Sequence, residues 1–343
     1  MSSQPQPQPP ILSVRHLKVQ FRPRGLMPWQ RRGPIHAVDD LHLDLRAGET
    51  LGIVGESGCG KSTLARTLVG LEQASSGSVR YGGRELLGLA KKDWRPLRRE
   101  IQMVFQDPLA SLDPKMTVGQ IVAEPLRELC PEIPAGQHAG LVAAMLQRVG
   151  LSPDAAERHP HEFSGGQAQR IGIARALIVR PKVLICDEAV SALDVSVRAQ
   201  IVNLLAELRR EYGLTLIFIA HDLAIVRYLC DRVLVMYLGK VMEQAPGEEL
   251  FALPRHPYTR ALLAAAPGAA AAQTAANAAA GKKKPRKAAG ATPDPAHPPM
   301  GCVYSTRCPL VESACMRSAP NLRRTGPEHY AACHFVAAPD STH

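Results

Sequence analysis

Short apolar runs and helical stripes alternate along most of the chain. Runs rich in β-branched residues predict buried strands at residues 50–54, 101–105, 183–186, 216–219 and 233–236. Two apolar stripes have helical spacing, one through Leu64, Leu68 and Leu71 and one through Val197, Ile201, Leu204, Leu205 and Leu208. Such stripes are typical of helices packed on a sheet. The alternation predicts a mostly parallel α/β fold from Ile11 to about Phe251.

The strand pattern stops between about residues 109 and 168. Two helical patterns replace it, at 118–129 and 141–149, with Pro131 and Pro134 between them. This stretch predicts a helical subdomain inserted into the α/β core. Composition sets the other boundaries: a Gln/Pro-rich tail (1–10), an α/β domain (11–255), a segment with a low-complexity linker (256–298) and a cysteine-rich region (299–343).

Charge favours anionic partners. The 343 residues carry 41 Lys and Arg against 31 Asp and Glu, a formal charge of +10, which suits a nucleotide, nucleic acid or an acidic membrane face. The basic run 282–287 is open to phosphate or lipid contact, although such runs are usually solvated. No stretch has the roughly 20 apolar residues of a membrane helix, and no secretory signal pattern opens the chain. We therefore expect a cytoplasmic protein whose eight cysteines are reduced or metal-bound.

A phosphate loop, Gly55-Glu-Ser-Gly-Cys-Gly-Lys-Ser62, follows the strand at 50–54 directly and opens a helix. Its glycines let the backbone approach a nucleotide and direct N–H groups at phosphate oxygens. Lys61 is expected to reach the β- and γ-phosphates, and the Ser62 hydroxyl to ligate Mg²⁺. Cys59 is interpreted as a tolerated small residue. The expected nucleotide-binding set of the loop is Gly55, Glu56, Ser57, Gly58, Cys59, Gly60, Lys61, Ser62 and Thr63.

Two carboxylates follow the predicted strand at 183–186. Asp187 is placed to hold Mg²⁺, directly or through water, and Glu188 to orient and deprotonate the attacking water. Phosphoryl transfer needs positioning and charge neutralisation more than covalent chemistry, so these groups suffice. An isolated Asp-Glu pair is more often a helix cap; the phosphate loop upstream favours the catalytic interpretation.

With Gln106, Ser164-Gly-Gly-Gln167 and His221 added, the series resembles the ATP-binding-cassette (ABC) ATPases, a phosphate-loop fold with a helical subdomain. The resemblance implies that Ser164 and Gly166, in a signature with Gly165 and Gln167, cap the γ-phosphate bound to a second subunit. It also implies that Gln106 senses Mg²⁺ and the attacking water, and that His221 contacts the γ-phosphate. Phe21 is the expected adenine-stacking residue, with Trp29 as a competitor.

Residues 105–114, 255–262 and 301–310 resemble, more narrowly, the ATPase subunits of bacterial dipeptide/oligopeptide importers. This implies ATP and Mg²⁺ as ligands and a peripheral place on the cytoplasmic face of the inner membrane. The implied partners are a second ATPase (a paralogue is favoured), two permease subunits gripped by the helical subdomain, and an extracytoplasmic binding protein. Ala168 and Ala189 depart from the common pattern, but neither is expected to touch phosphate, so we expect hydrolysis.

Four cysteines mark the C-terminal region: Cys302, Cys308, Cys315 and Cys333. Four thiolates in a reducing compartment suggest a metal. Related importer ATPases with such a tail are understood to carry a [4Fe–4S] cluster, which four cysteines suit. The spacing lacks the close pairs typical of structural zinc, and zinc and simple buried thiols remain the alternatives.

Two other functions stay open from the sequence. One is import of another small solute, such as nickel or a haem-like molecule. The other is a soluble ABC ATPase acting on DNA or the ribosome, which the positive charge supports weakly. Such proteins usually fuse two cassettes or carry long insertions, so no specific nucleic acid is expected as a partner.

Overall fold

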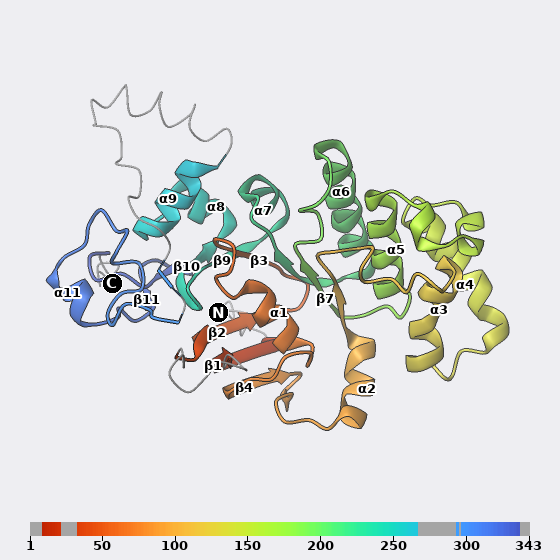
Figure 1. Cartoon of the computed structure of the whole chain (residues 1–343), viewed down its shortest axis with the longest axis horizontal. Coiled ribbons are helices and arrows are strands. Elements are labelled where there is room, and N and C mark those ends of the chain that lie inside the picture. Colours follow the sequence, from red (N-terminus) through yellow and green to blue (C-terminus); the bar gives the residue numbers. More distant parts are fainter. Residues whose placement is uncertain (1–8, 22–32, 267–292, 295, 337–343) are drawn as a thin grey trace, which may run out of the picture.

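The computed structural model describes residues 9–21, 33–266, 293–294 and 296–336 (Figure 1). Trp29, the basic run 282–287, most of the predicted tail and most of the predicted linker lie outside the described residues. In the ranges that are described, no helix combines the length and the apolar character needed to cross a membrane.

The larger sheet has eight strands in the order β11-β12-β10-β9-β3-β8-β7-β6. The stretch from β9 to β6 is parallel, and the strands at the other edge are antiparallel. All residues of β3, β7, β8 and β9 are buried, as expected where helices cover both faces. The bounds are β3 Thr50–Val54, β6 Ile101–Val104, β7 Val183–Asp187, β8 Thr215–Ile219, β9 Arg232–Tyr237, β10 Lys240–Pro246, β11 Arg323–Arg324 and β12 Tyr330–Ala331.

A smaller antiparallel sheet, in the order β2-β1-β4-β5, packs beside the first helix. Its strands are β1 Leu12–Phe21, β2 Ile35–Leu45, β4 Ser76–Tyr81 and β5 Arg84–Glu85. Helix α1, Lys61–Leu68, shares a core cluster with this sheet through Leu64 and Leu68. The prediction for Leu71 was wrong: the helix ends before Gly70, whose φ is 71°, and Leu71 is 55% exposed.

The helical subdomain lies at one end of the molecule, away from residues 296–336 (Figure 1). Helix α3 begins with a capping box, in which Thr117 and Gln120 satisfy each other's backbone N–H groups. Helix α4 starts six residues before the predicted start, immediately after Pro134. The bounds are α2 Lys91–Glu100, α3 Val118–Leu129, α4 Ala135–Arg148, the 3₁₀ turns Pro153–Glu157 and Pro160–Glu162, and α5 Gly165–Leu177.

Four more helices cover the sheet: α6 Val195–Tyr212, α7 Leu223–Leu229, α8 Gly247–Ala252 and α9 Pro257–Ala265. The predicted stripe of α6 is buried from Ile201 to Leu208, while Val197 is only partly buried. Gly213 ends this helix in the left-handed conformation, with φ of 61°. The apolar face of α6 therefore packs as the periodicity predicts.

Residues 296–336, here called the C-terminal segment, contain α11 (Ser313–Arg317) and extend the larger sheet through β11 and β12. A buried ion pair joins them to the α/β domain (residues 11–255), here called the cassette. His329 Nε2 lies 2.6 Å from Glu243 Oε1 of β10, and both side chains are fully buried. His329 Nδ1 lies 2.8 Å from Glu249 of α8. Burial opposes the charge on His329, but the hydrogen bonds to these two carboxylates raise its pKa above the ordinary value.

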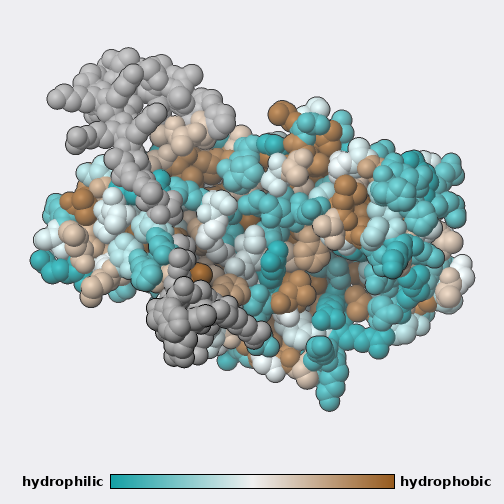
Figure 2. All heavy atoms as spheres, in the orientation of Figure 1, coloured by the Kyte–Doolittle hydropathy of each residue, from teal (hydrophilic) through white to brown (hydrophobic). Residues whose placement is uncertain are grey.

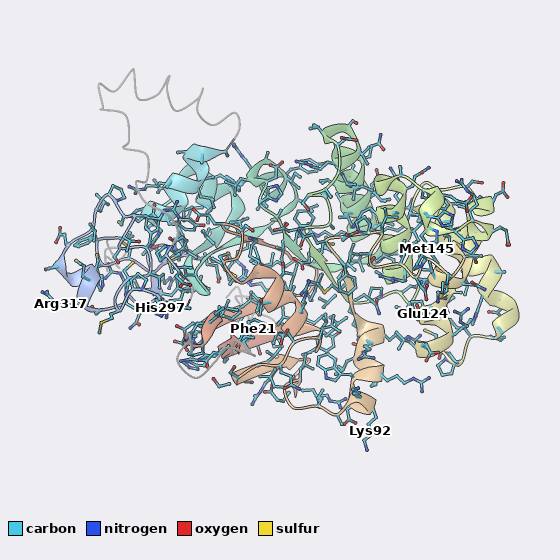
Figure 3. The ribbon with its side chains drawn as sticks, viewed as in Figure 1. Phe21, Lys92, Glu124, Met145, His297 and Arg317 are labelled. Atoms are coloured by element: carbon cyan, nitrogen blue, oxygen red, sulfur yellow. The ribbon has the colours of Figure 1, made fainter. Side chains whose placement is uncertain are left out.

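This pair predicts a pH dependence of stability. A histidine whose pKa is raised by folding stabilises the protein fully below its unfolded pKa, and the stabilisation is lost as pH rises through the folded pKa. We therefore expect the melting temperature of the wild type to fall as the pH rises from the ordinary pKa of histidine through the raised pKa of His329. The variant His329→Gln should lack this fall, and it should melt roughly 5 °C lower at pH 6, since one buried partner is removed. Exposed His297 provides the control, His297→Gln (Figure 3). Thermal unfolding between pH 6 and 9 measures both, and parallel profiles for all three proteins would contradict the assignment.

Candidate functional site

The phosphate loop lies between the end of β3 and the start of α1, and its backbone requires glycine. Gly55, Gly58 and Gly60 have φ values of 156°, 77° and 105°. A Cβ on Gly55 would collide with the carbonyl oxygen of Met236, and one on Gly60 with that of Ala37. No side chain fits there, and the backbone is free to approach phosphate oxygens.

Lys61 is held inside this loop. Its side chain is 3% exposed, and Nζ donates to the carbonyl oxygens of Gly55 (2.9 Å) and Glu56 (3.1 Å). Nζ also lies 3.9 Å from Glu188 Oε1. The ammonium group thus connects the loop to the predicted catalytic carboxylate.

Ser62, Asp187, Gln106 and Glu188 meet at the carboxyl edge of the sheet. The Ser62 hydroxyl donates to Asp187 Oδ1 (2.8 Å), and Gln106 Nε2 donates to Glu188 Oε2 (3.0 Å). Burial raises the pKa of Asp187, against the hydrogen bond from Ser62, and the nearby Glu188 charge raises it further. These hydroxyl, carboxylate and amide oxygens are the donor set that Mg²⁺ prefers, so the residues present fit that ion. Glu188 has a positive φ of 47°, unusual for a non-glycine residue and frequent at functional sites.

A cavity of about 210 Å³ opens over these groups. Sequence reasoning found most of its lining but missed the contribution of β2 and of the turn after β9. The full lining is Ile35, His36, Ala37, Ser57, Gly58, Gly60, Lys61, Ser62, Thr63, Gln106, Glu188 and Leu238. Phe21, 38% exposed, does not line this cavity, but it pairs with Ile35 in the β1–β2 register (labelled in Figure 3).

Cys59 is buried under the loop, and its side chain does not line the cavity. Burial raises the pKa of its thiol, in spite of the nearby Lys61 charge. A thiol of raised pKa is a weak nucleophile. This fits the interpretation of Cys59 as a packed small residue.

His221 and the Ser164 signature lie in different surroundings. His221 is exposed and lines a small neighbouring cavity together with Glu188. Ser164 caps α5 in a capping box with Gln167, and it does not line the phosphate cavity. Gly166 lies against Val197, where a Cβ would collide with the valine side chain, and Gly165 lies against Leu193. Within one chain the signature is therefore not part of the phosphate cavity.

The two departures from the common pattern, Ala168 and Ala189, are 0% and 2% exposed. Both pack in the larger core cluster. Their positions agree with the expectation that neither side chain touches phosphate.

The C-terminal cysteines lie in one neighbourhood but do not form a compact ligand set. Three are buried, Cys308 is half-buried, and all four are free thiols. Among the described residues, the one set of three or more metal-ligating groups within 4.8 Å of one another is His16, Asp40 and His42. No three of the C-terminal cysteine sulfurs lie within 4.8 Å of one another, although tetrahedral zinc needs its sulfur ligands that close. The zinc alternative therefore finds no support. The arrangement also gives none to the predicted [4Fe–4S] cluster.

Comparison with known proteins agrees with the fold and the site. The family model described as ABC transporter matches residues 38–191, and the one described as oligopeptide/dipeptide transporter, C-terminal region, matches residues 242–315. Among solved structures, cbiO1 of Clostridium perfringens, part of the ABC transporter complex cbiONQ, has a TM-score of 0.61 at 32% identity, over 72% of this chain and 92% of that one. The ABC transporter cassette MJ0796 in dimeric form has a TM-score of 0.62 at 26% identity, over 68% and 98%. The fold and site thus define an ABC-type ATPase.

Curated relatives narrow the class. The oligopeptide transport ATP-binding protein OppF of Escherichia coli (strain K12) is 51% identical over 91% of this chain and 92% of that protein. The oligopeptide transport ATP-binding protein AppF of Bacillus subtilis (strain 168) is 45% identical over 95% and 98%. The chain belongs to the family of oligopeptide-transport ATP-binding proteins of ABC transporters.

Proposed function

We propose that the chain binds and hydrolyses ATP as one of two ATPase subunits of an importer for dipeptides or oligopeptides. The observation that carries the proposal is the single cavity that joins Lys61, Ser62, Gln106 and Glu188. It contains a cation for the phosphates, oxygen ligands for Mg²⁺ and a carboxylate for the attacking water. The family of the chain supplies the coupling to transport.

Each side chain has a definite role in this proposal. Lys61 leaves its carbonyl partners for the β- and γ-phosphates, and Ser62, Asp187 and Gln106 would hold Mg²⁺, which neutralises phosphate charge. Glu188 accepts the proton of the attacking water, oriented by the hydrogen bond from Gln106. His221, beside Glu188 in the neighbouring cavity, contacts the γ-phosphate.

Variants of the two central residues should separate binding from hydrolysis. Glu188→Gln keeps the shape of the site but removes the base, so we expect ATP to bind while phosphate release slows at least ~100-fold. Lys61→Ala removes the phosphate cation, and we expect nucleotide affinity itself to fall. Titration with a fluorescent ATP analogue and a phosphate-release assay measure the two effects. Wild-type turnover in Glu188→Gln would show that another group is the base.

A second ATPase subunit completes the site in this proposal. Ser164, Gly165 and Gln167 are exposed at the start of α5 and do not line the phosphate cavity of their own chain. Such a helix terminus favours an anion, here the γ-phosphate on the partner. A paralogue is favoured as that partner, and adenine is expected to stack on Phe21.

Permease subunits are proposed to dock in a groove between the α/β core and the helical subdomain. A cavity of about 1210 Å³ is lined by the residues after β6, by α3 and by the loop before α6, and it includes Leu71, Trp94, Phe105, Leu109 and Glu124. Apolar residues lie among polar ones over this region (Figure 2). Leu71 and Leu109 are 55% and 44% exposed, and a groove with such apolar contacts suits an amphipathic permease helix. In this proposal the chain lies at the cytoplasmic face of the inner membrane, in a complex that receives peptide from an extracytoplasmic binding protein.

Leu109→Glu tests the groove. A charge there would have to be buried when the permease helix docks, so we expect at least about tenfold less permease to co-purify with the tagged chain. Nucleotide binding should be unaffected. The matched control is Leu141→Glu, since Leu141 is exposed on α4 but does not line the groove. Equal permease recovery with both variants would place the docking surface elsewhere.

A [4Fe–4S] cluster on Cys302, Cys308, Cys315 and Cys333 remains a hypothesis that rests on the resemblance. The Cys302 N–H donates to the Cys315 carbonyl (2.7 Å), and burial, with the other three thiols nearby, raises the pKa of Cys302 to about 11. A cluster bound by these cysteines as thiolates would therefore have to displace their protons, and the C-terminal segment would have to rearrange around it.

Metal analysis decides between the cluster and buried thiols. If the hypothesis is right, the chain purified without oxygen should contain about four iron and four sulfide ions and should lose them in the variant Cys308→Ser. A colourless protein with four alkylatable thiols and no iron would leave the C-terminal cysteines as packing residues.

The domain boundaries are proposed as the sequence suggests: an ATPase domain over 11–255 with a helical subdomain over about 109–168, then segments 256–298 and 299–343. Helices α3 and α4 and the two 3₁₀ turns lie within 109–168 and support the subdomain, and the family match at 38–191 lies within the proposed ATPase domain. Peptide is the proposed substrate class, and the relatives favour neither import of nickel or a haem-like molecule nor action on nucleic acid.

A further inference from the structure

The second residue of the phosphate loop, Glu56, is held by the C-terminal part of the chain. Its backbone N–H donates to the hydroxyl of Tyr258 on α9 (2.9 Å). Its carboxylate accepts from Arg307 of the C-terminal segment, whose Nη1 lies 2.9 Å from Oε1 and 2.8 Å from Oε2. Its carbonyl oxygen accepts from Lys61. The carboxylate, the peptide N–H and the carbonyl of one loop residue are therefore all fixed.

Arg307 is itself rigidly placed. Its side chain is 15% exposed, and its guanidinium lies 5.9 Å and 6.0 Å from the rings of Tyr237 and Tyr304. These rings pack with Tyr258 at centroid distances of 4.7 to 5.4 Å. The backbone N–H of Arg307 donates to the Tyr304 carbonyl (3.0 Å). A cation locked by packing in this way is preorganised for one partner.

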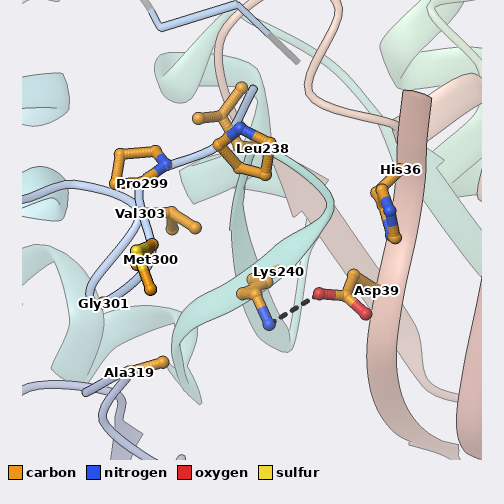
Figure 4. Close-up of a pocket in the computed structure, with 10 residues that line it drawn as sticks. His36, Asp39, Leu238, Lys240, Pro299, Met300, Gly301, Val303 and Ala319 are labelled. Carbon is orange, nitrogen blue, oxygen red and sulfur yellow. Dashed lines mark ion pairs between the residues drawn. The ribbon is translucent and has the colours of Figure 1, made fainter. Parts of the chain in front are cut away.

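The same segment also lines a cavity that shares two residues with the nucleotide cavity. A separate cavity of about 150 Å³ lies between Met300, Gly301 and Val303 of the C-terminal segment and His36, Asp39, Leu238 and Lys240 of the cassette (Figure 4). His36 and Leu238 line the phosphate cavity as well. The Arg307–Glu56 contact and this shared wall thus both place the C-terminal segment beside the nucleotide site.

The electrostatic consequence concerns a triphosphate bound to the loop. The Glu56 carboxylate is an anion within the loop that receives the phosphates, where it opposes their charge. Arg307 cancels it at hydrogen-bond distance. The hydrogen bond to Glu56 also raises the pKa of Arg307 above its ordinary value, so this neutralisation persists at any physiological pH.

We propose that Arg307 is a positioning residue for nucleotide binding, through which the C-terminal segment sets the ATP affinity of the phosphate loop. It acts on Glu56, holding the loop residue in place and neutralising its carboxylate, and it does not touch the nucleotide. The proposal deepens the proposed function and rests on the nucleotide site described above.

The test is the affinity of the full chain for a fluorescent ATP analogue in the presence of Mg²⁺. For Arg307→Ala we expect affinity to fall roughly five- to tenfold, because the Glu56 carboxylate, no longer neutralised, would oppose the charge of the bound phosphates. The KM for ATP should rise by the same factor, while kcat at saturating ATP stays within about twofold, because no contact made only in the transition state is lost. The control is Arg317→Ala, an exposed arginine on α11 at the outer end of the same segment (Figure 3).

Two further variants separate positioning from a loss of folding. Arg307→Lys should retain most of the affinity, because a single nitrogen of Arg307 contacts both carboxylate oxygens. The double variant Glu56→Gln/Arg307→Ala removes both charges and should bind more tightly than Arg307→Ala alone. Unchanged affinity in Arg307→Ala, or a double variant no better than the single one, overturns the proposal. Failure of the wild type to bind ATP would instead overturn the proposed function.

Discussion

Parallel strand pairing is the constraint on which the site depends. Strand β3 lies between β8 and β9, and β7 and β6 continue the sheet beyond β8, so all five strands end at the same edge. The register pairs Ile53 with Ile219, and Ile219 with Asp187. Glu188 follows Asp187 directly, and the phosphate loop and His221 each begin two residues after their paired residue. A shift of register would separate the cation from the catalytic carboxylate, and the buried apolar side chains on both faces oppose such a shift.

Those strands could be predicted because they are buried on both faces and form continuous β-branched runs. The antiparallel sheet is harder to predict from the sequence, because β1 and β2 alternate irregularly between buried and exposed residues and pair with several register shifts. Consequently His36 and Ala37 of β2 were missed as part of the nucleotide cavity. Leu71 was misplaced for a different reason: its spacing continues the helix stripe, but Gly70 ends the helix and leaves it exposed.

The C-terminal segment illustrates what local pattern cannot reveal. Arg307 and Glu56 are 251 residues apart, and their contact depends on how α9 and the C-terminal segment fold back on the cassette. In the sequence, Cys302 and Cys308 on either side of Arg307 stand out, because cysteines are common metal ligands. The structure instead gives the segment several polar attachments to the cassette, among them the pairs of His329 with Glu243 and of Arg307 with Glu56. A family-specific extension is in this way tied both to the sheet and to the phosphate loop.

The hydrogen bonds of Lys61 indicate how such a tie can matter for the chemistry. Its ammonium group is satisfied by two carbonyls of its own loop, so a phosphate must offer more than these acceptors. An ionised phosphate oxygen does so, since it adds the attraction between opposite charges to the hydrogen bond. The net free energy of exchanging carbonyl for phosphate depends on how the loop holds these carbonyls, and one of them belongs to Glu56. Because Tyr258 and Arg307 fix that residue, the exchange of carbonyl for phosphate takes place against a backbone that the distant end of the chain holds in position.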